Sequence, residues 1–155
     1  MNNKVLILSR DKAEKLPAVK DTAIISFCDP ITSRTPKGYK RIDYRGVCDN
    51  VFYVEIHDID IEILGDYGLT FETYFPEAPR LAKFIIKALK ENKSIICQCE
   101  YGQSRSAACA AAIKEFCDGT GIEIFADYRY YPNQLIFNKL LEALKTHKQK
   151  SERDC

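Results

Sequence analysis

A cysteine and an arginine frame a short polar stretch between two apolar segments of this chain. The stretch from Cys99 to Ser106 reads Cys-Glu-Tyr-Gly-Gln-Ser-Arg-Ser and lies between the apolar run Ile95–Cys97 and an alanine-rich run. The apolar run is typical of a buried strand, and the alanine-rich run is typical of a helix. A loop that joins a strand to a helix N-terminus directs backbone N–H groups and positive potential at a small cavity. The stretch therefore predicts a site for an anion.

The side chains of this loop suit chemistry on phosphate. Arg105 carries a planar fork of donors that fits two phosphate oxygens. The field that holds a phosphate dianion also stabilises a thiolate, the nucleophilic form of cysteine, so Cys99 is the predicted nucleophile. One helix dipole contributes only about 0.3–2 kcal/mol to the stability of such a thiolate. We therefore expect the arginine, the loop amides and a hydroxyl to stabilise it together with the dipole. Gly102 permits backbone angles that other residues avoid.

The same residues carry a resemblance to a known family. The segment from Cys99 to Ser106 matches the Cys-x5-Arg-Ser/Thr signature and resembles the phosphate loop of the cysteine-dependent protein tyrosine phosphatases. Its Gly-x-Ser-Arg-Ser ending resembles the dual-specificity branch of that family. A later pattern resembles the final helix of these phosphatases: Pro132, Asn133, Phe137, Leu140 and Leu141. The resemblance covers roughly residues 50–144.

This resemblance implies a role for each residue of the loop. Cys99 attacks phosphorus, while Arg105 and the backbone amides of residues 100–105 hold the phosphate oxygens. Ser106 hydrogen-bonds the sulfur and helps it leave in the second step. The implied substrate-binding residues lie between nucleophile and arginine: Glu100, Tyr101, Gly102, Gln103 and Ser104. This chemistry needs no metal or other cofactor, and no cluster of ligand residues in the sequence indicates one.

The reaction also needs a general acid, which the family places on a loop after an upstream strand. Asp58 follows directly from the predicted strand Asn50–His57, and we favour it because strand ends are structurally fixed. Asp60 and Asp66 remain alternatives, the latter in a glycine-flanked loop. Asp127, which follows the cysteine in the sequence, is a weaker candidate.

Two features of the sequence keep a second function open. Gln98 stands where the family usually has histidine, and Glu100 places a negative charge beside the nucleophile. A phosphate-binding pseudophosphatase that recognises phosphoproteins without turnover is therefore the alternative to a phosphatase. A sulfurtransferase also uses a cysteine loop at a helix N-terminus, but the five-residue spacing and the Ser-Arg-Ser ending favour phosphate.

The expected substrates are phosphorylated proteins or small phosphomonoesters. The loop lacks the lysines that phosphoinositide-directed relatives carry, which favours phosphotyrosine proteins, with phosphoserine and phosphothreonine as further targets. Tyr101 and the aromatic segment 127–131 are candidates for the pocket mouth, where they would suit a phosphotyrosine ring. Packing of these aromatic side chains around the proline turn is the equally simple interpretation.

The predicted elements form one α/β domain spanning residues 1–155. Strands are expected at Val5–Leu8, Thr22–Phe27 and Asn50–His57, in addition to the one before Cys99. A helix is expected over Phe75–Asn92 with Pro76 in its first turn, and a last helix is expected from Pro132. We predict a central, largely parallel sheet of four to five strands with helices on both faces, and the loop at the carboxyl ends of the strands. A basic, solvated tail is expected from about residue 146.

Composition excludes several classes of protein. The 155 residues are 46% hydrophobic and 29% charged with a net charge of +1, so neither nucleic acid nor an acidic membrane surface is an expected partner. No apolar run has the length of a signal peptide or a membrane span. The seven cysteines are odd in number and lack zinc-site spacing, which favours reduced thiols in the cytoplasm. The sequence does not indicate an oligomeric state, and a monomer is the simplest expectation.

Overall fold

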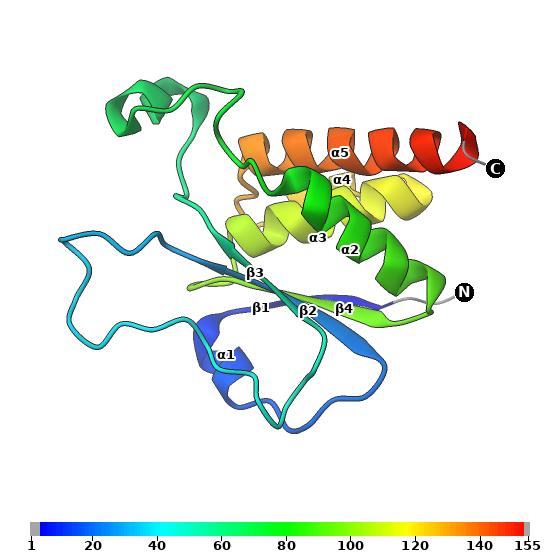
Figure 1. Cartoon of the computed structure of the whole chain (residues 1–155), viewed down its shortest axis with the longest axis horizontal. Coiled ribbons are helices and arrows are strands. Elements are labelled where there is room, and N and C mark those ends of the chain that lie inside the picture. The colour runs from blue at the N-terminus through cyan, green and yellow to red at the C-terminus, as the bar shows by residue number, and fades with distance from the viewer. Residues whose placement is uncertain (1–3, 154–155) are drawn as a thin grey trace.

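The fold is built on a four-stranded parallel sheet (Figure 1). The computed structural model describes residues 4–153. The strands lie in the order β1-β4-β2-β3, and each neighbouring pair is parallel. Their bounds are Val5–Leu8 for β1, Thr22–Cys28 for β2, Val51–Glu55 for β3 and Ser94–Gln98 for β4. Because all four strands run the same way, the segments that follow them meet at one edge of the sheet, where α/β proteins bind ligands.

Helices cover both faces of this sheet. The helices α2, α3, α4 and α5 lie on one face, and the short helix α1 lies on the other (Figure 1). The helices are α1 (Arg10–Glu14), the 3-10 helix η1 (Ile61–Tyr67), α2 (Ala78–Lys90), α3 (Arg105–Asp118), α4 (Ile122–Phe125) and α5 (Gln134–Arg153). The predicted single-domain α/β fold, with a parallel sheet between helical layers, is thus confirmed for the part of the chain that the structure describes.

Helix α3 is the central helix and leads directly out of the Cys99 loop. Its residues from Arg105 to Ile113 are all buried. Five of these residues are alanines, and their small side chains let the helix pack closely between the sheet and α5. The helix ends at Gly119, whose φ of +74° is the left-handed conformation typical of a helix C-terminus. This burial fixes the helix N-terminus, and with it the loop, relative to the sheet.

Two elements, α2 and η1, differ from the sequence-based expectations. Helix α2 begins at Ala78, later than the expected Phe75, because Phe75 has a φ of +64° and cannot continue a helix. Pro79, rather than Pro76, occupies the first turn. The glycine-flanked segment around Asp66, expected to be a loop, forms the 3-10 helix η1. Helix α5 continues through the basic segment from residue 146 to Arg153, and this segment is exposed over much of its length.

Candidate active site

The loop after β4 brings a cysteine thiol against a serine hydroxyl at the sheet edge. Cys99 follows the last residue of β4, and Ser106 lies in the first turn of α3. The Sγ atom of Cys99 lies 3.0 Å from the Oγ atom of Ser106. Cys99 is only 3% exposed and Ser106 is fully buried. A buried thiol in contact with a hydroxyl has a hydrogen-bond partner available in either protonation state.

The loop backbone turns its carbonyl groups outward. The carbonyls of Glu100 and Gln103 accept hydrogen bonds from the N–H groups of Arg10 (3.0 Å) and Tyr131 (2.8 Å), and that of Ser104 accepts from Asn133 (3.2 Å). Within residues 4–153, no hydrogen bond is donated by the backbone N–H groups of residues 100–105. Consecutive N–H groups that are free of protein acceptors form a concave site for an anion.

Gly102 holds this loop against the end of β1. Its φ is +67°, and a Cβ atom at this position would lie 2.7 Å from the backbone nitrogen of Ser9 and 2.9 Å from the carbonyl carbon of Leu8. Both the conformation and the space therefore require glycine. The close approach lets the backbone of β1 support the loop from behind.

Replacing Gly102 by alanine is expected to destabilise the protein and to weaken oxyanion binding. The left-handed conformation costs a non-glycine residue about 1–2 kcal/mol, and the contact with Ser9 forces the loop to shift. Thermal unfolding with and without added phosphate measures both effects. Gly65→Ala is the matched control because a Cβ there meets nothing within 4 Å. Equal stability of the two variants would show that the loop tolerates a Cβ atom.

The Arg105 guanidinium is buried and only partly paired. Its Nη1 donates to Oδ1 of Asp29 at 2.6 Å and to the backbone carbonyl of Ile56 at 2.9 Å. Arg105 is 5% exposed, and its buried Nε has no hydrogen-bond partner. A buried donor without an acceptor costs roughly 1–3 kcal/mol, so this edge of the guanidinium is a ready partner for an oxyanion in the loop.

Asp58 lies at the rim of the same loop. Its Oδ1 accepts hydrogen bonds from Oγ of Ser104 at 2.7 Å and from Nδ2 of Asn133 at 2.9 Å. These two donors come from the loop and from the residue before α5, so they fix the carboxylate beside the anion site. The structure therefore brings together Asp58 and the Cys99 loop, which are far apart in the sequence.

The other candidate acids are placed differently. Asp60 precedes η1 without a side-chain hydrogen bond to the helix, and Asp66 lies within η1. Asp127 pairs with Arg129 at 2.7 Å, and hydrogen bonding to that guanidinium holds the pKa of Asp127 below its ordinary value. A carboxyl group with a lowered pKa is a poorer proton donor, so Asp127 is the least suited of the four.

Gln98 belongs to a buried hydrogen-bond network behind the nucleophile. Its Oε1 accepts from Oγ of Ser26 at 2.5 Å and from the hydroxyl of Tyr44 at 2.9 Å. All three residues are at most 3% exposed. The network ties β4, β2 and the segment before β3 together immediately next to Cys99, and it does so without a charged group.

Replacing Tyr44 by phenylalanine is expected to cost about 1 kcal/mol of stability, because Gln98 keeps only one donor. Burial raises the pKa of Tyr44 above its ordinary value of 10.0. The folded state therefore keeps the phenol neutral while the unfolded chain ionises it, so stability falls as the pH rises above about 10. Above about pH 10, the stability of the Tyr44→Phe variant should therefore fall less steeply with pH than that of the wild type. Denaturant midpoints at about pH 8 and about pH 11 measure the slope, and parallel slopes would contradict the prediction.

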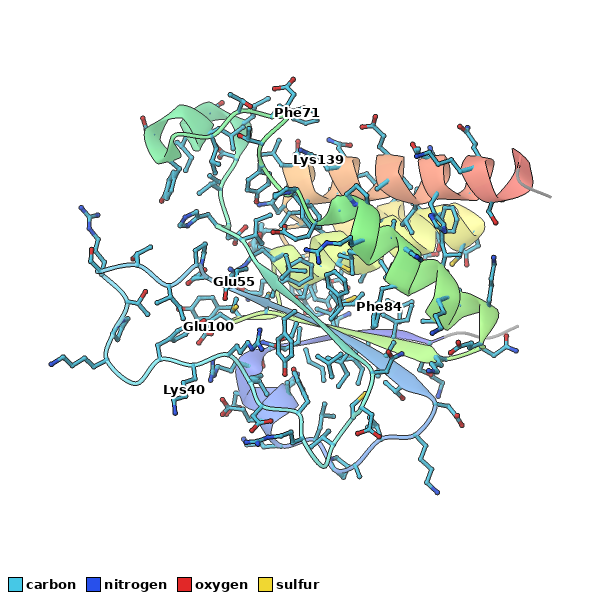
Figure 2. All side chains as sticks on the ribbon, in the orientation of Figure 1. Lys40, Glu55, Phe71, Phe84, Glu100 and Lys139 are labelled. Carbon is cyan, nitrogen blue, oxygen red and sulfur yellow. The ribbon has the colours of Figure 1, made fainter. Side chains whose placement is uncertain are left out.

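The remaining loop side chains face outward. The carboxylate of Glu100 lies 3.9 Å from Nη1 of Arg10, which also donates from Nη2 to the carbonyl of Lys40 at 2.6 Å. Figure 2 labels Glu100 at the end of β4 and Lys40 on the neighbouring loop. Tyr101 is 78% exposed at the rim. The charge of Glu100 is thus directed at a cation, and Tyr101 is free to contact a bound molecule.

Sequence reasoning missed Asp29 as a site residue. Asp29 directly follows β2, and the carboxyl ends of parallel strands gather at one edge of the sheet. That rule was the available signal, and it also applies to Arg10, which follows β1. Asn133 was seen as the start of the last helix, but its contact with Asp58 was not predicted.

The described residues, 4–153, include neither a candidate metal site nor a membrane-spanning helix. Residues 4–153 contain no group of three or more His, Cys, Asp or Glu side chains that could hold a metal ion. None of the helices in this described part of the chain is long and apolar enough to cross a bilayer. Six of the cysteines, Cys28 to Cys117, are free, and the seventh, Cys155, lies outside the described residues.

Comparison with known proteins finds the same fold in several solved structures. The sequence matches no family model, and it matches no curated protein. The structure of Tk-PTP in its active form superposes with a TM-score of 0.52 at 15% identity, covering 93% of each chain. That of PTPMT1 gives 0.51 at 14% identity over 98% of this chain and 96% of the other. The PTP-2 phosphatase of Cydia pomonella gives 0.51 at 15% identity over 91% and 86%. At these identities the likeness shows a shared fold.

Proposed function

We propose that this protein hydrolyses phosphate monoesters on phosphoproteins through a cysteinyl-phosphate intermediate. The single observation that supports this most directly is the orphaned, buried Nε of Arg105 beside the free N–H groups of residues 100–105. A tetrahedral oxyanion supplies acceptors for both. The Cys99 thiol stands at the start of the same loop, where a bound phosphorus atom would meet it.

In the first step, the Cys99 thiolate attacks phosphorus in line with the ester oxygen. The S–P bond forms as the P–O bond to the leaving group breaks, and Asp58 gives its proton to the leaving oxygen. Arg105 and the loop N–H groups hold the three remaining oxygens as their charge redistributes.

In the second step, a water molecule attacks the phosphocysteine. Asp58, now a carboxylate, takes a proton from the water, and the S–P bond breaks to release inorganic phosphate. The returning thiolate accepts a hydrogen bond from Ser106, whose Oγ lies 3.0 Å from the sulfur. The enzyme is thereby restored with its starting protons.

Phosphotyrosine is the substrate side chain that this rim suits best. Tyr101 is 78% exposed at the tip of the loop. Tyr131 is 72% exposed and lies beside the loop, where its backbone N–H donates to the carbonyl of Gln103. A structure of PTPMT1 has been solved in complex with PI(5)P, but residues 100–104 of this chain include no lysine for additional phosphate groups. Action in the cytosol, which the cysteine content favours, belongs to the same proposal.

Phosphate release from nitrophenyl phosphate, measured with excess chelator, tests the proposal. We expect turnover that survives the chelator and is competitively inhibited by tungstate, an oxyanion that would occupy the loop. Tungstate binding without any turnover would instead support the pseudophosphatase, which the neutral Gln98 behind the nucleophile favours. Turnover that the chelator removes would overturn the cysteine mechanism.

Replacing Asp58 by asparagine is expected to lower nitrophenyl phosphate turnover by about 10²-fold, the lower end for a general acid, because nitrophenolate leaves without much help. The loss should grow with poorer leaving groups, and the fall in rate with rising pH that reports deprotonation of the general acid should vanish. Asp60→Asn and Asp66→Asn are the matched controls. A larger, leaving-group-dependent loss in either of these variants would transfer the acid role to it.

A further inference from the structure

A cleft opens from the Asp58 side of the candidate active site and runs between the η1 segment and the start of α5. Its volume is about 610 Å³, within the range of sites that hold ligands. The segment that carries η1 stands away from the sheet beyond the end of β3 (Figure 1), and it forms one wall. The residues before α5 and its first turns form the other wall.

The cleft is continuous with the anion site. Asp58 and Ser104 line it, and the hydrogen bond of 2.7 Å between them also forms the rim of the Cys99 loop. A chain whose phosphorylated side chain entered the loop could therefore extend its neighbouring residues into this cleft without crossing an element of the fold.

Exposed apolar side chains lie along the cleft. Ile61 is 63% exposed and Tyr131 is 72% exposed, on opposite walls. Phe71 is 39% exposed and lies beside α5, as Figure 2 shows for Phe71 and Lys139. Apolar side chains gathered around a polar cleft are typical of a surface that binds another chain.

The charge of the cleft has one sign. Besides the proposed general acid Asp58, its lining includes the carboxylates of Asp60 and Glu62 and no lysine, arginine or histidine. The ammonium of Lys139 lies 5.1 Å from the Phe71 ring, but it donates to the carbonyls of Phe71, Glu72 and Tyr74. Arg129, near Tyr131 in the sequence, is paired with Asp127. A polyphosphorylated ligand would be repelled here, and a cationic one would be attracted.

We propose that this cleft binds the residues that flank the phosphorylated side chain of a protein substrate, and that it selects a flank with a basic and an apolar side chain. The basic side chain meets Asp60 and Glu62, and the apolar one packs on Ile61 or Phe71. This inference rests on the proposed function for the position of the phosphate, but its test uses binding and does not require turnover.

The test measures the affinity of the Cys99→Ser protein for fluorescent phosphotyrosine peptides. Arginine or glutamate is placed in turn at each position on either side of the phosphotyrosine in an otherwise neutral peptide. At one or more of these positions, we expect the arginine peptide to bind about fivefold more tightly than the glutamate peptide, the upper end for an exposed charge pair. The preference should fade as salt is added, because exposed charges are screened.

Charge reversal in the cleft should reverse that preference. Adding Glu62→Lys to Cys99→Ser should make the glutamate peptide the tighter binder at the same position. Asp49→Lys is the matched control, since it makes the same charge change on an exposed residue before β3, at the opposite end of that strand from the cleft. Replacing Ile61 by serine should weaken the binding of peptides with a leucine in the flank more than the binding of peptides with a serine there.

Each outcome separates this inference from the proposed phosphatase activity. Equal binding of arginine and glutamate peptides at every position would overturn it, whether or not the wild type releases phosphate. An arginine preference that Glu62→Lys leaves intact, or tighter binding to phosphoinositide vesicles than to the arginine peptides, would also overturn it. A wild type that prefers arginine flanks yet releases no phosphate would support the cleft and refute the activity.

Discussion

Replacing Cys99 by serine is expected to lower phosphate release by at least about 10⁴-fold, as the removal of a catalytic nucleophile does in other enzymes. A serine hydroxyl is smaller than the thiol and far less acidic, so no anionic nucleophile forms at neutral pH. The donors on the other side of the phosphate are untouched, because Arg105 keeps its contacts with Asp29 and Ile56. Phosphate or tungstate should therefore still bind, and calorimetry on the variant measures this directly.

Cys117→Ser is the control for this variant. Cys117 lies at the exposed end of α3, in the same helix that follows the loop. It should retain full turnover and the stability of the wild type. If Cys99→Ser kept substantial turnover at neutral pH, or if Cys117→Ser lost it, then the chemistry would not depend on the thiol at the start of the loop.

The loop itself could be predicted from the sequence because its signals are local. The apolar strand before Cys99, the alanines after Ser106 and the glycine between them each reflect short-range physics, namely burial, helix propensity and backbone freedom. The structure adds a reason for Gly102 that no local pattern contains, since the residue that would clash is Ser9, which follows β1 and lies far away in the sequence.

The rest of the site depends on which strands are neighbours. Asp29 contacts Arg105 only because β2 lies next to β4 in the sheet, and the sequence does not state that order. The choice among three aspartates stayed open for a similar reason, since the contact of Asp58 with Asn133 joins residues 75 positions apart. The start of α2 was misplaced because the left-handed conformation of Phe75 is imposed by its buried surroundings and not by its type.

Replacing Arg105 by lysine is expected to lower phosphate release by about 10³-fold, as losing transition-state donors does elsewhere. In the wild type, Nη1 is occupied by Asp29 and Ile56, which leaves the Nε edge for the phosphate. A lysine ammonium is a single point of charge, so it cannot hold those two protein acceptors and also present a planar edge to two phosphate oxygens. The loss should appear mainly in kcat, because the charge on the phosphate oxygens redistributes in the transition state and these donors stabilise it most strongly there.

Asp29→Asn separates the anchoring of the guanidinium from its contact with phosphate. The amide retains the shape of the carboxylate and one acceptor for Nη1, but it loses the negative charge. Because the Asp29 side chain is 60% exposed, water already screens this ion pair, so a loss of about fivefold or less is expected. Steady-state kinetics on both variants measure the two effects. Equal losses in Arg105→Lys and Asp29→Asn would mean that Arg105 acts through its ion pair, and that its free edge does not bind the substrate.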